Sequence, residues 1–319
     1  MKKLISVCVP CRNEVGNVAP LSEEIVKQLE QLPQYDFEII FIDNCSEDGT
    51  QDILREICAK DNRIKAILNA KNFPYGSGLH VIFQAHGDCV ISIPADFQIP
   101  VELIPEMITA WERGAKVVAL QKKSGKHDKI RFIRKLYYRM SKQFSDHDSL
   151  PGFTGSGLYD KSFITMCKTR HDPLIWSNMY HMVAQYAAPL VKKVYHEQPR
   201  RSGKTNNSVN NLIDTAIMRF TTISDVFPRY AILAGLLTGV ASLFISFYYL
   251  IRKLLDWHNF PLGMAPLIIG MFFLGAIQLI FLGIMGEYIL KINKRQKNEP
   301  HVIEKERINF EDISDENKE

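Results

Sequence analysis

Short β-branched stretches alternate with helical stretches over the first 121 residues. Strands are expected at Leu4–Val9, Phe37–Ile42, Ile64–Leu68, Cys89–Ile93 and Lys116–Leu120. Between them, apolar residues recur at three- and four-residue spacing, which predicts helices near 18–32, 50–60, 78–87 and 101–113. Strands that alternate with helices form a largely parallel sheet covered on both faces. Such sheets bind ligands at the carboxyl ends of their strands, so the functional residues are expected in the loops that follow each strand.

Two long uncharged apolar runs lie in the C-terminal third of the chain. Ala231–Ile251 contains 21 residues and Met264–Gly286 contains 23. At about 1.5 Å per residue, each run is long enough for a hydrocarbon layer of about 30 Å. A Lys or Asp in mid-span would cost about 3 kcal/mol, so the lack of charge is typical of a span. We predict two transmembrane helices.

The basic residues beside these runs predict the orientation. The connector between the runs holds two basic residues, Arg252 and Lys253. The outer flanks hold eight, namely Arg219, Arg229, Lys291, Lys294, Arg295, Lys297, Lys305 and Arg307. Because basic residues stay on the cytoplasmic side, we expect both termini to be cytoplasmic in a multi-pass protein of the inner or plasma membrane.

Two further segments have an amphipathic pattern. Residues 128–144 combine an apolar stripe with basic residues around it, among them Arg131, Arg134, Lys135, Arg139 and Lys142, which fits either a solvated surface helix or a helix at a membrane surface. Residues 209–224 repeat the pattern directly before the first apolar run, which favours an interfacial helix over a core helix. Residues 304–319, with seven acidic and three basic residues, are expected to be mobile.

Composition narrows the class of protein. With 46% apolar and 23% charged residues, the chain is neither disordered nor wholly embedded in a membrane. A net charge of +4 does not indicate a nucleic-acid partner. The first residues, MKKLISVCVP, resemble a signal peptide but stop at Pro10, so a first strand is the better interpretation. Cys8 and Cys11 form a lone CxxC without a second pair, which favours buried reduced thiols over a metal or redox site.

Two loops after strands carry candidate chemistry. Asp43 ends the second strand, where a carboxylate can accept a nucleobase N–H or a ribose hydroxyl, although a helix cap explains it equally well. Asp96 and Gln98 follow the fourth strand. If that segment is extended, the two side chains point to the same side and offer hard oxygen ligands to Mg²⁺ or Mn²⁺. The alternative is a proline-rich turn with a capping Asp.

Five motifs occur together and in order. They are VPCRNEVGN, FIDNCSEDGT, GDCVISIPADFQIPVELIPE, TGSGLYDKSFI and PRRSGKTNNSVNNLIDTAI, the last just before the apolar runs. The set resembles family 2 glycosyltransferases with the nucleotide-diphospho-sugar transferase (GT-A) fold. More closely, it resembles the polyprenyl-phosphate glycosyltransferases, such as dolichyl-phosphate mannose synthase and the bactoprenyl-phosphate glucosyltransferases. The resemblance covers residues 4–295. It implies a mostly parallel α/β GT-A sheet with helices on both faces.

The resemblance also assigns residues to roles. Pro10, Asn13 and Glu14 match the nucleotide-binding loop, and Asp43 matches an aspartate that usually contacts uracil. Asp96 and Gln98 match the last two positions of a D-x-D-x-Q site for a divalent metal. Arg200, with Gly203 and Thr205, matches the R-x-x-G-x-S/T segment near the phosphates. Asp96 and Arg200 are thus the expected catalytic residues.

Three positions depart from the family pattern. Pro94 stands at the first metal-site aspartate, Asn44 at a frequent second aspartate after Asp43, and Asn206 where lysine is common. The loss of a carboxylate at Pro94 is expected to weaken metal affinity or to shift it onto Asp96, Gln98 and the substrate phosphates.

The resemblance implies inverting transfer of a sugar from a nucleotide diphosphate, most simply UDP, to a polyprenyl phosphate at the cytosolic membrane face. We therefore divide the chain into a cytosolic glycosyltransferase domain (1–207), a juxtamembrane amphipathic helix (208–229), a two-helix membrane region (230–290) and an acidic tail (291–319). The basic residues expected to meet the lipid phosphate are Arg131, Arg134, Arg201 and Lys204. Assembly into a homo-oligomer through the spans is a further expectation.

Two other functions remain open from the sequence. A membrane glycosyltransferase that extends a polysaccharide directly usually has more spans and a Q-x-x-R-W motif, which this chain lacks. A membrane scaffold that kept the fold but lost catalytic power is the other, and Pro94 keeps it open.

Overall fold

A computed structural model describes residues 2–74, 76–123, 150, 152–169, 179–201 and 302–310, with isolated residues between 244 and 289. The chain divides into two compact units, Met1–Asp214 with Glu299–Glu319, and Thr215–Asn298. Within the described residues, no helix is both long enough and apolar enough to cross a membrane. Both predicted amphipathic helices, and all but scattered residues of the two predicted spans, lie outside the described residues.

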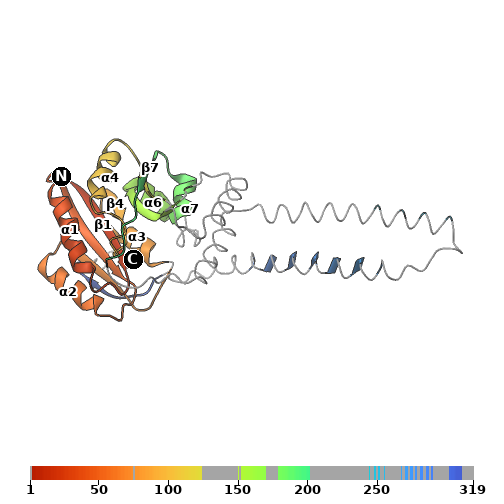
Figure 1. The fold of residues 1–319 in the computed structure, drawn as a ribbon, viewed down its shortest axis with the longest axis horizontal. Coiled ribbons are helices and arrows are strands. Elements are labelled where there is room, and N and C mark those ends of the chain that lie inside the picture. The colour runs from red at the N-terminus through yellow and green to blue at the C-terminus, as the bar shows by residue number, and fades with distance from the viewer. Residues whose placement is uncertain are drawn as a thin grey trace, which may run out of the picture. The chain divides into compact units, whose positions relative to one another are not determined.

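The first unit contains an eight-stranded sheet in the order β7-β5-β6-β4-β1-β2-β3-β8 (Figure 1). Its strands are β1 (Lys3–Cys11), β2 (Tyr35–Asp43), β3 (Ile64–Asn69), β4 (Cys89–Ser92), β5 (Val117–Lys122), β6 (Phe153–Asp160), β7 (Leu190–Tyr195) and β8 (Glu304–Ile308). The five strands predicted from sequence are confirmed, with ends that shift by at most two residues. The sequence pattern does not predict β6, β7 or β8.

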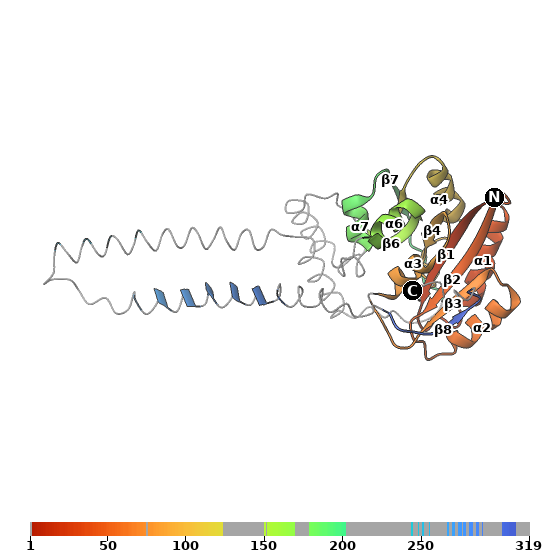
Figure 2. The same cartoon turned by 180° about the vertical axis from the view of Figure 1, so that it is seen from behind.

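Helices cover both faces of the sheet. They are α1 (Val18–Glu30), α2 (Thr50–Lys60), α3 (Ser77–Gln84), α4 (Leu103–Glu112), α6 (Lys161–Thr169) and α7 (Met179–Tyr186). α1 and α2 lie on one side of the strands, and α3 and α6 lie on the other, as both views show (Figures 1 and 2). The predicted α/β architecture is therefore confirmed.

The strands are buried on both faces, which explains their nearly continuous apolar sequences. On β1, Ile5, Val7 and Val9 belong to the core shared with α1, α2 and α4, and none has exposed surface. The opposite face of β1 carries Cys8, whose thiol donates to the carbonyl of Val81 in α3 at 3.5 Å. Burial raises the pKa of the Cys8 thiol well above its usual value, as expected for an inert buried cysteine.

β6 makes the sheet mixed rather than purely parallel, because it pairs antiparallel with both β4 and β5. Its sequence, FTGSGLYD, contains two glycines and lacks the β-branched pattern that predicts the other strands. Gly157 has φ +152°, and a Cβ there would lie 2.1 Å from the carbonyl oxygen of Val118 in β5. The motif glycine thus lets two strands approach closely.

The prediction of a mobile tail from residue 304 is wrong for its first part. Glu304–Ile308 forms β8, which pairs antiparallel with β3. Glu304 accepts a hydrogen bond from His80 at 2.5 Å, and Glu306 pairs with Arg55 at 2.8 Å. Burial raises the pKa of Glu304, but the contacts with His80 and Arg307 outweigh it and lower the pKa to about 2. The charges that suggested disorder have fixed partners far away in the sequence.

Arg55→Glu should therefore weaken the attachment of β8, because it places like charges opposite Glu306. Both side chains are 38% exposed, so solvent screens the pair and the loss should be about 0.5–1 kcal/mol. The measurement is amide hydrogen exchange in β8, which should be faster in the variant than in the wild type. Adding Glu306→Arg to the variant restores an opposite-charge pair and should bring exchange back toward the wild-type rate. Equal exchange in all three proteins would show that the pair does not hold the strand.

Candidate functional site

Four loops meet at one edge of the sheet. β1, β2 and β4 run parallel, and β7 shares their direction because it is parallel to β5, while β5 and β4 are each antiparallel to β6. The carboxyl ends of these strands lead to Glu14, Asp43, Asp96 and Arg200. The topology therefore brings the predicted site residues Glu14, Asp43 and Asp96 to the same edge of the sheet as Arg200.

The loops after β1 and β2 are held together by a set of hydrogen bonds. The Asn13 amide donates to the Ser46 hydroxyl at 2.8 Å, and the Asn13 side-chain oxygen accepts from the Glu47 amide at 3.0 Å. The Glu14 amide donates to the Thr50 hydroxyl at 2.9 Å. Asn13 adopts φ +56°, a left-handed conformation that asparagine tolerates better than most residues. The predicted nucleotide loop is thus fixed in place before any ligand binds.

Asp43 is fully buried, and its carboxylate stabilises the loop that follows β2. Its carboxylate accepts hydrogen bonds from the Ser46 amide at 3.0 Å, from the Ser46 hydroxyl and from the Gln51 side chain at 2.7 Å. It does not cap α2, which begins after Gly49 without a side-chain cap. The structure therefore shows a loop-shaping role for Asp43, and its contact with uracil stays a prediction.

Asn44, where the family often has an aspartate, uses both ends of its amide. Its nitrogen donates to Asn72 at 2.7 Å, and its oxygen accepts from the Phe73 amide at 2.7 Å and from Asn69 at 3.2 Å. An ionised carboxylate has no N–H to donate to Asn72. The substitution thus ties the loop after β2 to the loop after β3.

The segment around Asp96 is a turn, so the extended geometry expected for Asp96 and Gln98 is wrong. β4 ends at Ser92, and Phe97 adopts φ +61°. The Gln98 amide donates to Asp96 Oδ1 at 3.1 Å, which closes the turn. Phe97 is 9% exposed and belongs to the hydrophobic core, so the turn places this side chain inside the fold. Asp96 is also buried, yet its second oxygen, Oδ2, contacts a residue from another loop.

That contact is with Arg200, which follows β7. Arg200 Nη2 donates to Asp96 Oδ2 at 2.9 Å, and Arg200 Nη1 lies 3.6 Å from Glu14 Oε1. The segment is also held by the Gln198 amide, which donates to the Gln98 carbonyl at 3.1 Å. Two of the predicted site residues, Asp96 and Arg200, are thus paired directly, and Glu14 joins them.

Glu14 lies in an environment where its charge is costly. Burial raises the pKa of Glu14, and the charges of Asp96 and Asp48 add to that effect. A hydrogen bond from Asn17 and the positive charge of Arg200 act in the opposite direction without cancelling it. The positive charge of Arg200 therefore offsets part of the electrostatic cost of burying the Glu14 carboxylate.

The remaining candidate residues fall into two groups. Pro10 lies within β1 opposite Ile42, and Arg201 sits over the Phe97 ring at 5.1 Å, so both are at the same edge. Outside the described residues lie Arg131, Arg134, Gly203, Lys204, Thr205 and Asn206. For Arg131, Arg134 and Lys204, contact with the acceptor phosphate stays a prediction.

Sequence reasoning missed the residues that support the first loop. Asp48 accepts from the Val15 amide at 3.2 Å and from the Thr50 amide at 3.1 Å, and Ser46 bridges Asp43 and Asn13. The polar run DNCSEDGT directly after a buried strand is the signal that could have identified them.

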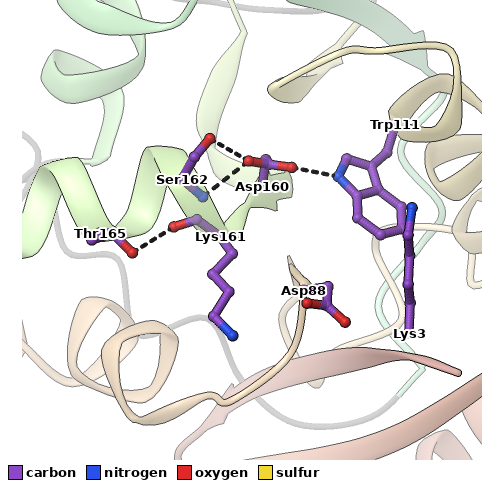
Figure 3. A pocket seen from close by; sticks show the side chains of 7 residues that line it. All are labelled: Lys3, Asp88, Trp111, Asp160, Lys161, Ser162 and Thr165. Atoms are coloured by element: carbon purple, nitrogen blue, oxygen red, sulfur yellow. Dashed lines mark hydrogen bonds between the residues drawn. The ribbon is translucent and has the colours of Figure 1, made fainter. Parts of the chain in front are cut away.

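The described part of the chain also has a hollow of about 590 Å³ at the opposite edge of the sheet (Figure 3). It is lined by Lys3, Asp88, Trp111, Asp160, Lys161, Ser162 and Thr165. Asp160 accepts hydrogen bonds from Trp111 at 2.7 Å, from Lys116 at 2.9 Å and from the Ser162 amide at 2.9 Å. These bonds join α4, β6 and α6, so Asp160 has a structural role. The candidate active site is therefore the opposite edge of the sheet, at the carboxyl ends of the strands.

Comparison with known proteins identifies the family. The model of "Glycosyl transferase family 2" matches residues 6–164. A Shigella flexneri protein, the SfII prophage-derived bactoprenol glucosyl transferase, is 30% identical over 308 residues, which cover 94% of this chain and 96% of that protein. The chain belongs to glycosyl transferase family 2. It is a glycosyltransferase with an α/β, GT-A-like mixed sheet, as the motifs imply.

A second relative is similar over nearly its whole length. The Escherichia coli prophage bactoprenol glucosyl transferase homolog is 28% identical over 303 residues, covering 94% of this chain and 97% of that protein. Among solved structures, glucosyl-3-phosphoglycerate synthase from Mycobacterium tuberculosis, in complex with Mn²⁺, UDP and phosphoglyceric acid, has a TM-score of 0.47 and 16% identity, covering 67% of this chain and 75% of that chain.

Proposed function

We propose that this glycosyltransferase moves a sugar from a nucleotide diphosphate sugar, in particular a UDP-sugar, to a polyprenyl phosphate at the cytosolic face of a membrane. One observation carries the proposal. Asp96, Glu14 and Arg200 come together at the carboxyl edge of the sheet, where ligands of such sheets bind, and the backbone amide of Gln98 closes the turn that carries Asp96. The similarity to bactoprenol glucosyl transferases along almost the whole chain supports the choice of acceptor.

A divalent metal fits the donor set at this edge. A carboxylate and an amide are hard oxygen ligands of the kind that Mg²⁺ and Mn²⁺ prefer. The Arg200 guanidinium already contacts Asp96 and Glu14, which indicates that these carboxylates form a site that attracts cations. Asp96 and Gln98 would hold the metal, which when bound supplies a Lewis acid that stabilises the charge of the departing diphosphate.

The reaction needs no strong general base. A phosphomonoester has a second pKa near 6, so at pH 7 the acceptor is mostly a dianion and a competent nucleophile. One of its oxygens forms a bond to the anomeric carbon while the bond to the diphosphate oxygen breaks, so UDP leaves with the electron pair. A single in-line displacement inverts the anomeric centre. Arg200 offers positive charge beside the leaving group, and the fixed loops after β1 and β2 orient the nucleotide.

A membrane location follows from the acceptor. Removing a long prenyl chain from a bilayer costs about 0.8 kcal/mol per CH₂, so the enzyme has to work at the interface. Isolated described residues in and beside the two predicted spans are helical, and large apolar side chains among them are exposed, for example Phe244 by 72%, Leu255 by 81% and Leu267 by 67%. Exposed apolar side chains on helices suit contact with lipid, which supports the proposed spans.

The test is transfer of radiolabelled sugar into the lipid phase. Full-length protein in detergent is given undecaprenyl phosphate, Mn²⁺ and a panel of nucleotide sugars, and the organic extract is counted. We expect label from one UDP-sugar to enter the extract in an acid-labile product. Label in an acid-stable polymer would instead indicate direct polysaccharide extension. No transfer and no UDP release from any donor would support the scaffold alternative.

A further inference from the structure

Two buried carboxylates from different loops share a single cation. Glu14 is 7% exposed and Asp96 is 6% exposed, and they contact the two terminal nitrogens of the Arg200 guanidinium. An ordinary surface ion pair has solvated partners and contributes little. Here only the arginine side chain retains appreciable exposure, 26%, while each carboxylate side chain retains 8%. The carboxylates are built into the fold, and the cation reaches them from a segment at the surface.

Each carboxylate has one oxygen anchored within its own loop. Glu14 Oε2 accepts from the Asn17 side chain at 2.5 Å, and Asp96 Oδ1 accepts from the Gln98 amide at 3.1 Å. The other two oxygens, Glu14 Oε1 and Asp96 Oδ2, face the same guanidinium. The anchoring sets the direction of these two oxygens independently of Arg200, so they can receive another cation.

Glu14 supplies a carboxylate that the loop after β4 lacks at Pro94. The family motif places two carboxylates on the loop after β4, and this chain keeps only Asp96 there. The loop after β1 brings Glu14 to the same guanidinium, and its backbone is fixed by the Thr50 hydroxyl at 2.9 Å. A second carboxylate is therefore present at the site, from another strand of the sheet.

We propose that Glu14 and Asp96 form one cation site, occupied in turn by the Arg200 guanidinium and by the divalent metal that enters with the nucleotide sugar. The inference rests on the proposed function and adds Glu14 to its metal ligands. Arg200 has to leave Asp96 before the metal binds. Its positive charge then becomes available to the phosphates that arrive at the same edge.

The segment that carries Arg200 has other attachments that would survive its release. The Gln198 amide stays bonded to the Gln98 carbonyl at 3.1 Å, and Arg201 stays over the Phe97 ring at 5.1 Å. A change of side-chain rotamer at Arg200 is then sufficient, without movement of the backbone. The exchange of cations is a local event.

Metal binding in the absence of any sugar donor tests the inference. Full-length protein in detergent is titrated with Mn²⁺, and free Mn²⁺ is measured by electron paramagnetic resonance. Arg200→Ala removes the competing cation, so Mn²⁺ should bind about tenfold more tightly than in the wild type, a difference of about 1.4 kcal/mol. Arg113→Ala is the matched control, because it removes the same charge from an exposed side chain at the end of α4, away from Glu14 and Asp96. It should change the affinity by less than about twofold.

A second substitution tests Glu14 itself. In the Arg200→Ala background, Glu14→Gln keeps the shape and the hydrogen-bonding capacity toward Asn17 but removes the charge. We expect Mn²⁺ affinity to fall by about tenfold or more from that of Arg200→Ala. Equal Mn²⁺ affinities of the Arg200→Ala and Arg113→Ala proteins would refute the competition. An unchanged affinity on adding Glu14→Gln would refute the role of Glu14.

These outcomes are separate from those of the lipid-transfer assay, because Mn²⁺ titration uses neither nucleotide sugar nor lipid. If the titrations follow the expected pattern and no label enters lipid, the shared cation site stands and the proposed function fails. If label enters lipid but the titrations show no competition, the function stands and this inference fails.

Discussion

Asp96→Asn should lower the rate of sugar transfer by a factor on the order of a thousand, the largest effect that we expect from one substitution in this chain. The new amide keeps an oxygen that can accept from the Gln98 amide, so the turn should persist. The variant loses the negative charge that meets Arg200 at 2.9 Å and that the metal site requires. The measurement is the initial rate of label transfer to undecaprenyl phosphate at saturating nucleotide sugar.

Asp36→Asn is the matched control for this prediction. Asp36 is exposed near the amino end of β2, at the opposite edge of the sheet, so the same chemical change there should leave the rate within about twofold. Thermal unfolding of both variants checks that the fold is intact. Undiminished turnover in a well-folded Asp96→Asn protein would remove Asp96 from the catalytic site.

Lys65→Met should produce the second large effect, this time on stability. Glu38 is 4% exposed, and it pairs with Lys65 at 2.7 Å while its other oxygen accepts from the Ser6 hydroxyl at 2.5 Å and the His86 amide at 3.0 Å. Without Lys65, an uncompensated charge stays buried between β1 and β3, at a cost of about 3 kcal/mol. The unfolding midpoint of the full chain should fall by about 6–12 °C.

Glu38→Gln is the informative comparison, because it removes the other partner of the same pair. The amide oxygen can still accept from Ser6 and His86, and the partly exposed Lys65 can turn toward water. We expect a loss of only about 1 kcal/mol. Equal losses in the Lys65→Met and Glu38→Gln proteins would mean that burial of the Glu38 charge is not what makes Lys65 necessary.

The pH dependence has a defined sign. Burial raises the pKa of Glu38, but hydrogen bonds from Lys65, Ser6 and His86 outweigh it, and the pKa lies below its usual 4.5. The ionised pair therefore contributes stability above pH 4.5, and this contribution is lost as the pH falls through the lower folded-state pKa. In Lys65→Met the pKa of Glu38 rises, so protonation relieves the buried charge. The loss of unfolding free energy in Lys65→Met, relative to the wild type, should be smaller at about pH 5 than at about pH 7.

The strands and helices of the first 122 residues were predictable because burial repeats with a local period. Ile5, Val7 and Val9 face one helix layer, and the residues between them face the other, so the pattern itself encodes a sheet covered on both sides. The candidate residues at the carboxyl edge were found for the same reason, since the ends of such strands are visible in the sequence.

The parts that were missed depend on partners distant in the sequence. The turn at Asp96 accompanies the burial of Phe97, and Arg200, the partner of Asp96, lies 104 positions further along the chain. β8 has no apolar signature, because Glu304 and Glu306 are matched by His80 and Arg55. The approach of Glu14 to Arg200 likewise exists only once β1 and β7 lie in one sheet.

β8 is synthesised long after β3, the strand with which it pairs, and this order has a consequence for biosynthesis. Arg55 and Glu306, which help to join β8 to the body of the sheet, are 251 positions apart. A ribosome adding about 5–20 residues per second needs roughly 10–50 s to cover that distance. During this interval the outer side of β3, with its unpaired N–H and C=O groups, is open to other nascent chains. We expect chaperone dependence during translation to exceed that of a sheet whose edges are made in sequence order.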